Sequence, residues 1–258
     1  MKKTIGILAA SVAMALSSSA NAVVVETIDL FTTPQATLTD ATTGDGGIYS
    51  QVFSGGGDIL GGYRDIGVDL LTSPFGTKAE IQVAGGALSF SSGSTSTAAG
   101  LIRWDGRAAA TDMGVPSFGL GASLNPFGTF FELKTIFSDL GYHFVLEAYT
   151  DATHWSRVDL LAHAVPLTMP DGVASLVPLL GFLDCTNSMG GPLTTCGADG
   201  AVDWSNLNAL QAIIDPFGQT VSVDLTLNQV TVVPEPASLA LVGLGMLGLG
   251  AMRRRRTS

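Results

Sequence analysis

The most constraining feature of this chain is a strict alternation of apolar and polar side chains over residues 219–227. Val221, Val223, Leu225 and Leu227 occupy the odd positions, and polar residues fill the positions between them. A period of two places alternate side chains on opposite faces of a strand. The pattern therefore predicts a half-buried strand with one face against a core.

Shorter runs of the same kind recur along the chain, and Gly, Ser, Thr, Asp and Pro separate them. About ten short strands without alternating helices favour an antiparallel sandwich or barrel over a parallel α/β sheet. The further predicted strands cover residues 23–30, 48–53, 66–71, 79–83, 87–91, 100–104, 129–137, 142–150 and 155–162.

Residues 207–214 fit two structures. Leu207, Leu210 and Ile214 have helical spacing, whereas the turn sequence at 215–218 favours a short strand joined to the final strand as a hairpin. Of the two structures, we expect the strand.

The first 22 residues have the parts of a secretory signal peptide. Lys2 and Lys3 precede an apolar stretch at residues 5–16, and Ala20 and Ala22 supply the small residues that signal peptidase requires. We expect cleavage after Ala22. An uncleaved signal anchor is the alternative, but the apolar run is short for a membrane span.

A second apolar segment, residues 237–252, carries no charge and is followed at once by Arg253, Arg254, Arg255 and Arg256. As a helix it would span about 24 Å, somewhat less than the roughly 30 Å hydrocarbon core of a bilayer. Arginines kept on the cytoplasmic side would place the preceding chain outside the cytoplasm. Both ends of the chain therefore predict the same topology.

Three elements in order, Pro234-Glu235-Pro236, the apolar segment and the arginine cluster, resemble the PEP-CTERM sorting signal of Gram-negative bacteria. The resemblance implies that Pro234, Glu235 and Pro236 form the motif recognised by an exosortase. It also implies a transient transmembrane span at 237–252 and a stop-transfer role for the arginines. The prolines stop strands and helices and leave an extended segment, which a protease-like active site can engage. A rigid spacer before an ordinary anchor helix is the alternative.

This resemblance implies export across the inner membrane to the cell surface or extracellular matrix, in association with exopolysaccharide and biofilm. It also favours a jelly-roll-like form of the all-β sandwich. We expect a signal peptide at 1–22, one antiparallel β-sandwich ectodomain at 23–233 and a sorting segment at 234–258.

The distribution of charge argues against a nucleic-acid partner. Six of the 12 basic residues lie at the two ends, so residues 23–233 hold 6 basic and 21 acidic residues, a net charge of −15. Binding to nucleic acid requires clustered Lys and Arg that displace phosphate counterions.

Cys185 and Cys196 are the only cysteines of the chain. Export places them in an oxidising compartment, so an even pair flanking a Gly- and Pro-containing loop predicts a local disulfide. A catalytic thiol acting with His163 is the alternative, and no motif supports it.

Familiar catalytic motifs are absent from the sequence: there is no G-x-S-x-G elbow, no H-E-x-x-H motif and no P-loop. His143, His154 and His163 lie on separate predicted segments, so three ordinary histidines are favoured over a metal triad. We expect no catalytic residues, no metal ligands and no cofactor.

Carboxylates and aromatic residues leave two binding hypotheses open. Asp184, Asp199 and Asp203 could gather around the disulfide loop and bind Ca²⁺, although solvated surface acids are favoured. Aromatic side chains could stack on sugar rings, although aromatic residues in a β protein are more often part of the core. These aromatic residues are Tyr49, Tyr63, Trp104, Trp155 and Trp204.

Two classes of function therefore remain. The first, which we favour, is a non-enzymatic surface or matrix protein that is secreted, sorted and then anchored or released into an exopolysaccharide layer, with glycan binding as one option. The second is a secreted hydrolase that acts on polysaccharide, or a calcium-dependent carbohydrate-binding protein. A hydrolase requires a cleft with two carboxylates at glycosidase spacing.

Overall fold

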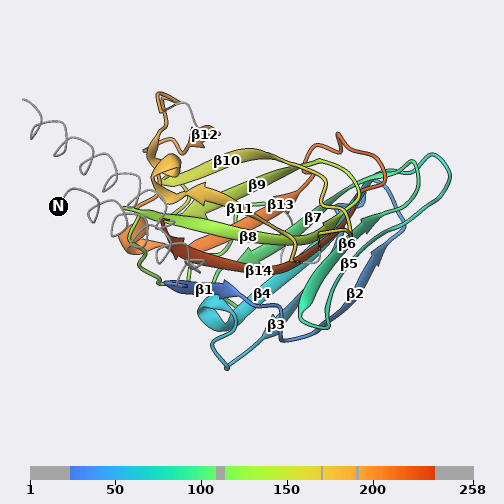
Figure 1. Ribbon diagram of the computed structural model, residues 1–258, viewed down its shortest axis with the longest axis horizontal. Helices are drawn as coiled ribbons and strands as arrows, with labels where there is room; N and C mark the ends of the chain where they lie inside the picture. The colour runs from blue at the N-terminus through green and yellow to red at the C-terminus, as the bar shows by residue number, and fades with distance from the viewer. Residues whose placement is uncertain (1–23, 109–113, 170, 190–191, 236–258) are drawn as a thin grey trace, which may run out of the picture. The chain divides into compact units, whose positions relative to one another are not determined.

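A computed structural model describes residues 24–108, 114–169, 171–189 and 192–235 (Figure 1). Within it, Val25–Val233 form one compact unit. The predicted signal peptide with Ala20 and Ala22, Pro236, the apolar segment and the four arginines lie outside the described residues. Among the described residues, no helix has the length and apolar character needed to cross a membrane.

The described chain forms two antiparallel seven-stranded sheets (Figure 1). Sheet A has the order β11-β8-β14-β6-β5-β2, with β1 also paired to β14, and sheet B has the order β12-β10-β9-β13-β7-β4-β3. The strands of sheet A are β1 (Glu26–Asp29), β2 (Gln35–Asp40), β5 (Ala79–Ala84), β6 (Ala87–Ser92), β8 (Thr129–Ser138), β11 (Val173–Pro178) and β14 (Asp224–Pro234). Those of sheet B are β3 (Ile48–Phe53), β4 (Tyr63–Thr72), β7 (Thr97–Trp104), β9 (Tyr142–Tyr149), β10 (Trp155–Ala162), β12 (Leu193–Cys196) and β13 (Ala209–Ile214). Short 3₁₀ helices occupy Leu60–Gly62 (η1), Leu179–Leu183 (η2) and Trp204–Asn206 (η3).

The core lies between the two sheets and follows the period of two. In β5, Ile81 and Val83 are buried while Glu80 between its buried neighbours is exposed. Phe90 of β6 packs in the same core cluster as Ile66 of β4. The predicted all-β antiparallel sandwich is confirmed.

The region around the final strand differs from the prediction at both ends. β13 is a strand, as expected, but it belongs to sheet B while β14 belongs to sheet A, so the predicted hairpin is wrong. The carboxylate of Asp215 accepts hydrogen bonds from the backbone N–H groups of Gln219 (3.1 Å) and Thr220 (3.0 Å). These bonds hold residues 215–223 as a connection between the sheets, and β14 begins only at Asp224.

A buried ion pair joins the two sheets inside the core. Arg64 of β4 and Asp29 of β1 are both fully buried, and their Nη1 and Oδ1 atoms lie 3.0 Å apart. Asp29 also accepts hydrogen bonds from Trp104 Nε1 (2.8 Å) and the Phe31 N–H (2.8 Å), and Arg64 Nε donates to Gln35 Oε1 (3.0 Å). Every partner thus replaces hydrogen bonds that these charges would make with water.

Replacing Arg64 tests the importance of this pair. We expect Arg64→Met to lower the free energy of unfolding by about 3 to 5 kcal/mol, because it leaves Asp29 buried without its cation. Urea unfolding measures the loss. Lys134→Met on β8, a partly exposed lysine, serves as the control, and equal losses in both variants would contradict the structural role assigned to Arg64.

Candidate functional site

The sorting motif predicted from the sequence begins where the last core strand ends. β14 ends at Pro234, Val233 is buried, and Glu235 is exposed. The backbone N–H of Val25 donates to the carbonyl of Val232 at 2.8 Å, which ties the start of the described chain to this end of β14. No spacer therefore separates the sandwich from the first residue of the motif.

The disulfide predicted between Cys185 and Cys196 is present, with the two Cα atoms 5.6 Å apart. It ties the loop that follows η2 to β12, which pairs with β10. Asp184 beside it accepts hydrogen bonds from Thr186 Oγ1 and Ser188 Oγ (3.0 Å each), together with the Met189 N–H (2.7 Å). Backbone donors therefore lower the pKa of Asp184 to about 2.

The other two aspartates proposed for calcium do not join Asp184 in a carboxylate cluster among the described residues. Asp203 caps η3 through Ser205, whose N–H and Oγ lie 2.9 Å and 2.7 Å from Oδ1 and lower the pKa of Asp203. The cluster that the described chain does contain is formed by Asp40, Asp45 and Asp69, whose carboxylate oxygens lie within 4.8 Å of one another. Sequence reasoning missed it because its members lie far apart along the chain.

Asp40 in this cluster already has structural partners. Its Oδ2 accepts the Leu70 N–H at 2.7 Å, and its Oδ1 accepts the Thr42 N–H at 3.0 Å. Burial, followed by the charges of Asp40 and Asp45, raises the pKa of Asp69.

A row of polar side chains crosses the outer face of sheet B. Cross-strand register aligns its members on six strands, so that each faces the next. We call this set the polar row: Gln51, Asp65, Arg103, Gln211, Glu147 and Arg157.

Hydrogen bonds link most neighbours in the polar row. Gln51 Nε2 donates to Asp65 Oδ1 at 2.7 Å, and Arg103 Nε donates to Gln211 Oε1 at 2.9 Å. Gln211 Nε2 donates to Glu147 Oε2, and Arg157 Nη1 lies 3.4 Å from Glu147 Oε1. The charges of the row are thus largely compensated within one sheet face.

The connection between β7 and β8 reaches over this face. Gln51 Nε2 donates to the carbonyl of Arg107, and Arg103 Nη2 donates to that of Gly114 (2.6 Å each). The N–H groups of Gly119 and Leu120 donate to the carbonyl of Asn208. This connection therefore helps to bury Arg103, and all residues of β7 are buried although the strand has two faces.

Two carboxylates under this connection keep an oxygen without a hydrogen-bond partner among the described residues, namely Oδ2 of Asp65 and of Asp105. Both residues are 1% exposed. Burial, together with the nearby charge of Asp105, raises the pKa of Asp65 to about 7. The hydrogen bond from Gln51 acts in the opposite direction and lowers this pKa. Burial is also the main cause of the raised pKa of Asp105.

The histidines and aromatic residues singled out from the sequence lie in separate places. His143 contacts Asp159 at 3.3 Å and His154 contacts Asp151 at 3.0 Å, while His163 lines a cavity beside β10. Trp104 and Trp204 are core residues, Tyr49 packs on the outer face of sheet B, and ring contacts pair Tyr63 with Phe53 and Trp155 with Tyr149.

Comparison with known families identifies a sorting motif at the C-terminal end of the sequence. The PEP-CTERM protein-sorting motif matches residues 232–256, so its match begins inside β14. The chain therefore carries the signal of an exported protein that is anchored by its C-terminus before an exosortase processes it. A search of curated proteins finds no match to the chain.

Asp65 makes the stability of the sandwich depend on pH. Because burial raises the folded-state pKa of Asp65 from 3.8 to about 7, the protonated carboxyl stabilises the fold fully below pH 4. This stabilisation is lost as the pH rises through 7. We expect Asp65→Asn to stabilise the protein relative to the wild type by about 4 kcal/mol more at pH 8 than at pH 4. Thermal and urea unfolding across this range measure the difference, with Asp171→Asn, an exposed aspartate, as control. An equal pH dependence in both variants would disprove the assignment.

The disulfide contributes to stability mainly by restricting its loop. We expect the Cys185→Ser/Cys196→Ser double variant to lose up to about 3 kcal/mol of unfolding free energy and to be cleaved faster by proteases within residues 186–195. Urea unfolding and peptide mapping measure both effects. Two reactive thiols in a titration of the native wild-type protein would contradict the bridge.

Proposed function

We propose that this chain is a non-enzymatic protein of the cell surface or extracellular matrix, associated with exopolysaccharide. In this proposal signal peptidase removes residues 1–22 and an exosortase processes the sorting segment. The supporting observation is that the PEP-CTERM motif begins within the last residues of β14, an interior strand of sheet A. The segment offered to the exosortase is thus attached to a folded export domain without a linker.

The composition of the exported domain agrees with a role among acidic polymers. With a net charge of −15 over residues 23–233, from 6 basic and 21 acidic residues, it repels other acidic chains unless cations bridge them. Such a domain stays soluble outside the cell and contacts an acidic matrix in the presence of divalent cations.

A hydrolase needs carboxylates in an accessible cleft. The walls of the cavity between β9 and β11, of its neighbour and of the hollow beside Arg107 contain no aspartate or glutamate among the described residues. Asp65 and Asp105, which have a raised pKa and each keep one carboxylate oxygen without a partner among the described residues, are buried under the β7–β8 connection. We therefore favour association with polysaccharide over hydrolysis of polysaccharide as the function of this chain.

Processing is tested by the mass of the mature C-terminus. We expect a Glu235→Ala/Pro236→Ala variant to retain its hydrophobic tail in the native host, as the wild-type protein does in cells without exosortase, because the extended motif is lost. Asp224→Asn, at the exposed start of β14, is the control and should be processed normally. Normal processing of the double variant, or of the wild-type protein without exosortase, would refute this role.

Association is tested by incubating the mature protein with the host's own exopolysaccharide. We expect the polysaccharide to retain the protein while no new reducing ends form. Release of reducing ends would instead establish a hydrolase, and loss of binding in EDTA would establish dependence on calcium or another divalent cation. A result in which the polysaccharide does not retain the protein and is not cleaved would contradict a matrix role.

A further inference from the structure

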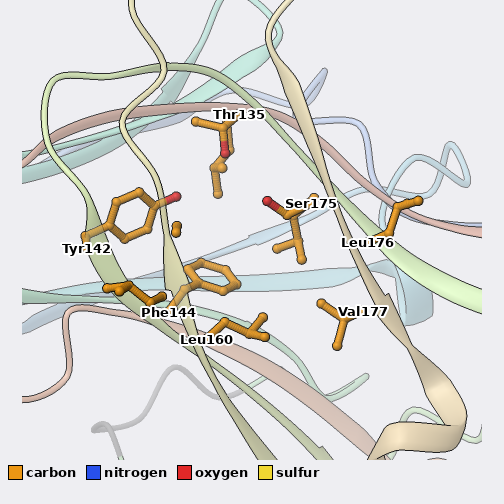
Figure 2. Close-up of a pocket in the computed structure, with 11 residues that line it drawn as sticks. Thr135, Tyr142, Phe144, Leu160, Ser175, Leu176 and Val177 are labelled. Atoms are coloured by element: carbon orange, nitrogen blue, oxygen red, sulfur yellow. The ribbon is translucent and has the colours of Figure 1, made fainter. Parts of the chain in front are cut away.

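A cavity of about 100 Å³ opens between the two sheets, where β8 and β11 of sheet A face β9 and β10 of sheet B (Figure 2). Its walls combine two kinds of side chain. Phe144, Leu160 and Val177 form an apolar part, and Thr135, Tyr142 and Ser175 bring three hydroxyl groups. Figure 2 shows these three hydroxyl oxygens turned toward a common space.

The hydroxyl group of Tyr142 is the most informative feature of this cavity. Tyr142 is 2% exposed, and burial raises its pKa to about 12, so the phenol is a neutral hydrogen-bond donor at physiological pH. Its side chain forms a hydrogen bond with that of Thr135. A phenol and a threonine hydroxyl can each both donate and accept, so this pair keeps capacity for a further hydrogen bond. Together with Ser175 on the opposite wall, the pair can hydrogen-bond a polar group inside the cavity.

None of the described residues that line this cavity is charged. A carboxylate or ammonium group would lose its hydration there without gaining a counter-ion, which excludes an ionised head group. A hydroxyl or carbonyl group, in contrast, would be matched by the three wall hydroxyls.

A second cavity of about 140 Å³ adjoins this space. It shares Thr135 and Ser175 with the first cavity and is rimmed by the exposed side chains of Leu161, Met169 and Val173. An apolar cavity of about 150 Å³ holds a molecule the size of benzene, so the first space suits about four non-hydrogen atoms and the two adjoining spaces together about ten.

We propose that this cavity binds a small neutral amphiphile, with a hydroxyl or carbonyl head on Tyr142, Thr135 and Ser175 and a short alkyl chain along Phe144, Leu160 and Val177. This site is distinct from the sorting segment and from the polar row. It goes beyond association with polysaccharide, and it stands or falls independently of that proposal.

The probe for this site is 1-hexanol, with hexanoate as its ionised analogue. With the full ectodomain at pH 7.5, we expect titration followed by NMR to show saturable binding of 1-hexanol and at least about tenfold weaker binding of hexanoate. Contacts between the probe and the methyl groups of Leu160 and Val177 locate the chain. Equal affinity for both probes, or no saturable binding of 1-hexanol at millimolar concentration, would overturn the proposal.

The head-group contact is tested by Tyr142→Phe, which removes one oxygen atom and preserves the ring. We expect a five- to tenfold loss of affinity for 1-hexanol, which is about the effect of one hydrogen bond. Tyr63→Phe, a phenol that packs on Phe53 outside this cavity, is the matched control and should bind as the wild type does. If Tyr142→Phe fails to fold, Ser175→Ala replaces it, with a loss of binding again expected. Unchanged affinity in a folded variant would overturn the placement of the head group.

Discussion

The ion pair between Arg64 and Asp29 is the contact on which the arrangement of the two sheets depends. Trp104 Nε1 donates to the same carboxylate, so strands β1, β4 and β7 meet at one buried anion. Because side chains alternate along a strand, a slip of one residue in β4 would turn Arg64 to the outside and Asp65 into the core. The network therefore specifies register as well as binding the sheets together.

The same alternation explains why the outer face of sheet B is polar and yet buried. With Arg64 inside, Asp65 must point outward, and with Trp104 inside, Arg103 and Asp105 must do the same. The β7–β8 connection then covers these side chains and supplies carbonyl acceptors for Gln51 and Arg103. Burial of Asp65 and Asp105 raises their pKa values, so the stability of this face falls as the pH rises toward neutrality.

The position of β14 connects the fold with export. This strand lies between β8 and β6 within sheet A and also pairs with β1, so sheet A is complete only when the last residues before the motif are in place (Figure 1). The PEP-CTERM motif match begins at residue 232, within that strand. The strand that completes the sandwich therefore also carries the start of the sorting signal.

Most interior strands could be predicted from the sequence, whereas β2, β11 and β12 were missed, and each of these lies at the edge of a sheet. An edge strand buries less of its surface and so has a weaker apolar pattern, as the mixed burial of β11 shows. The sequence by itself determined the C-terminal sorting signal, the disulfide pair and the phase of the central strands, because each depends on neighbouring residues. Only the tertiary structure decided that the polar positions of six strands form one row and that three hydroxyls share one cavity. Those groups meet through pairing and packing between strands far apart in the chain, and local periodicity carries no information about that.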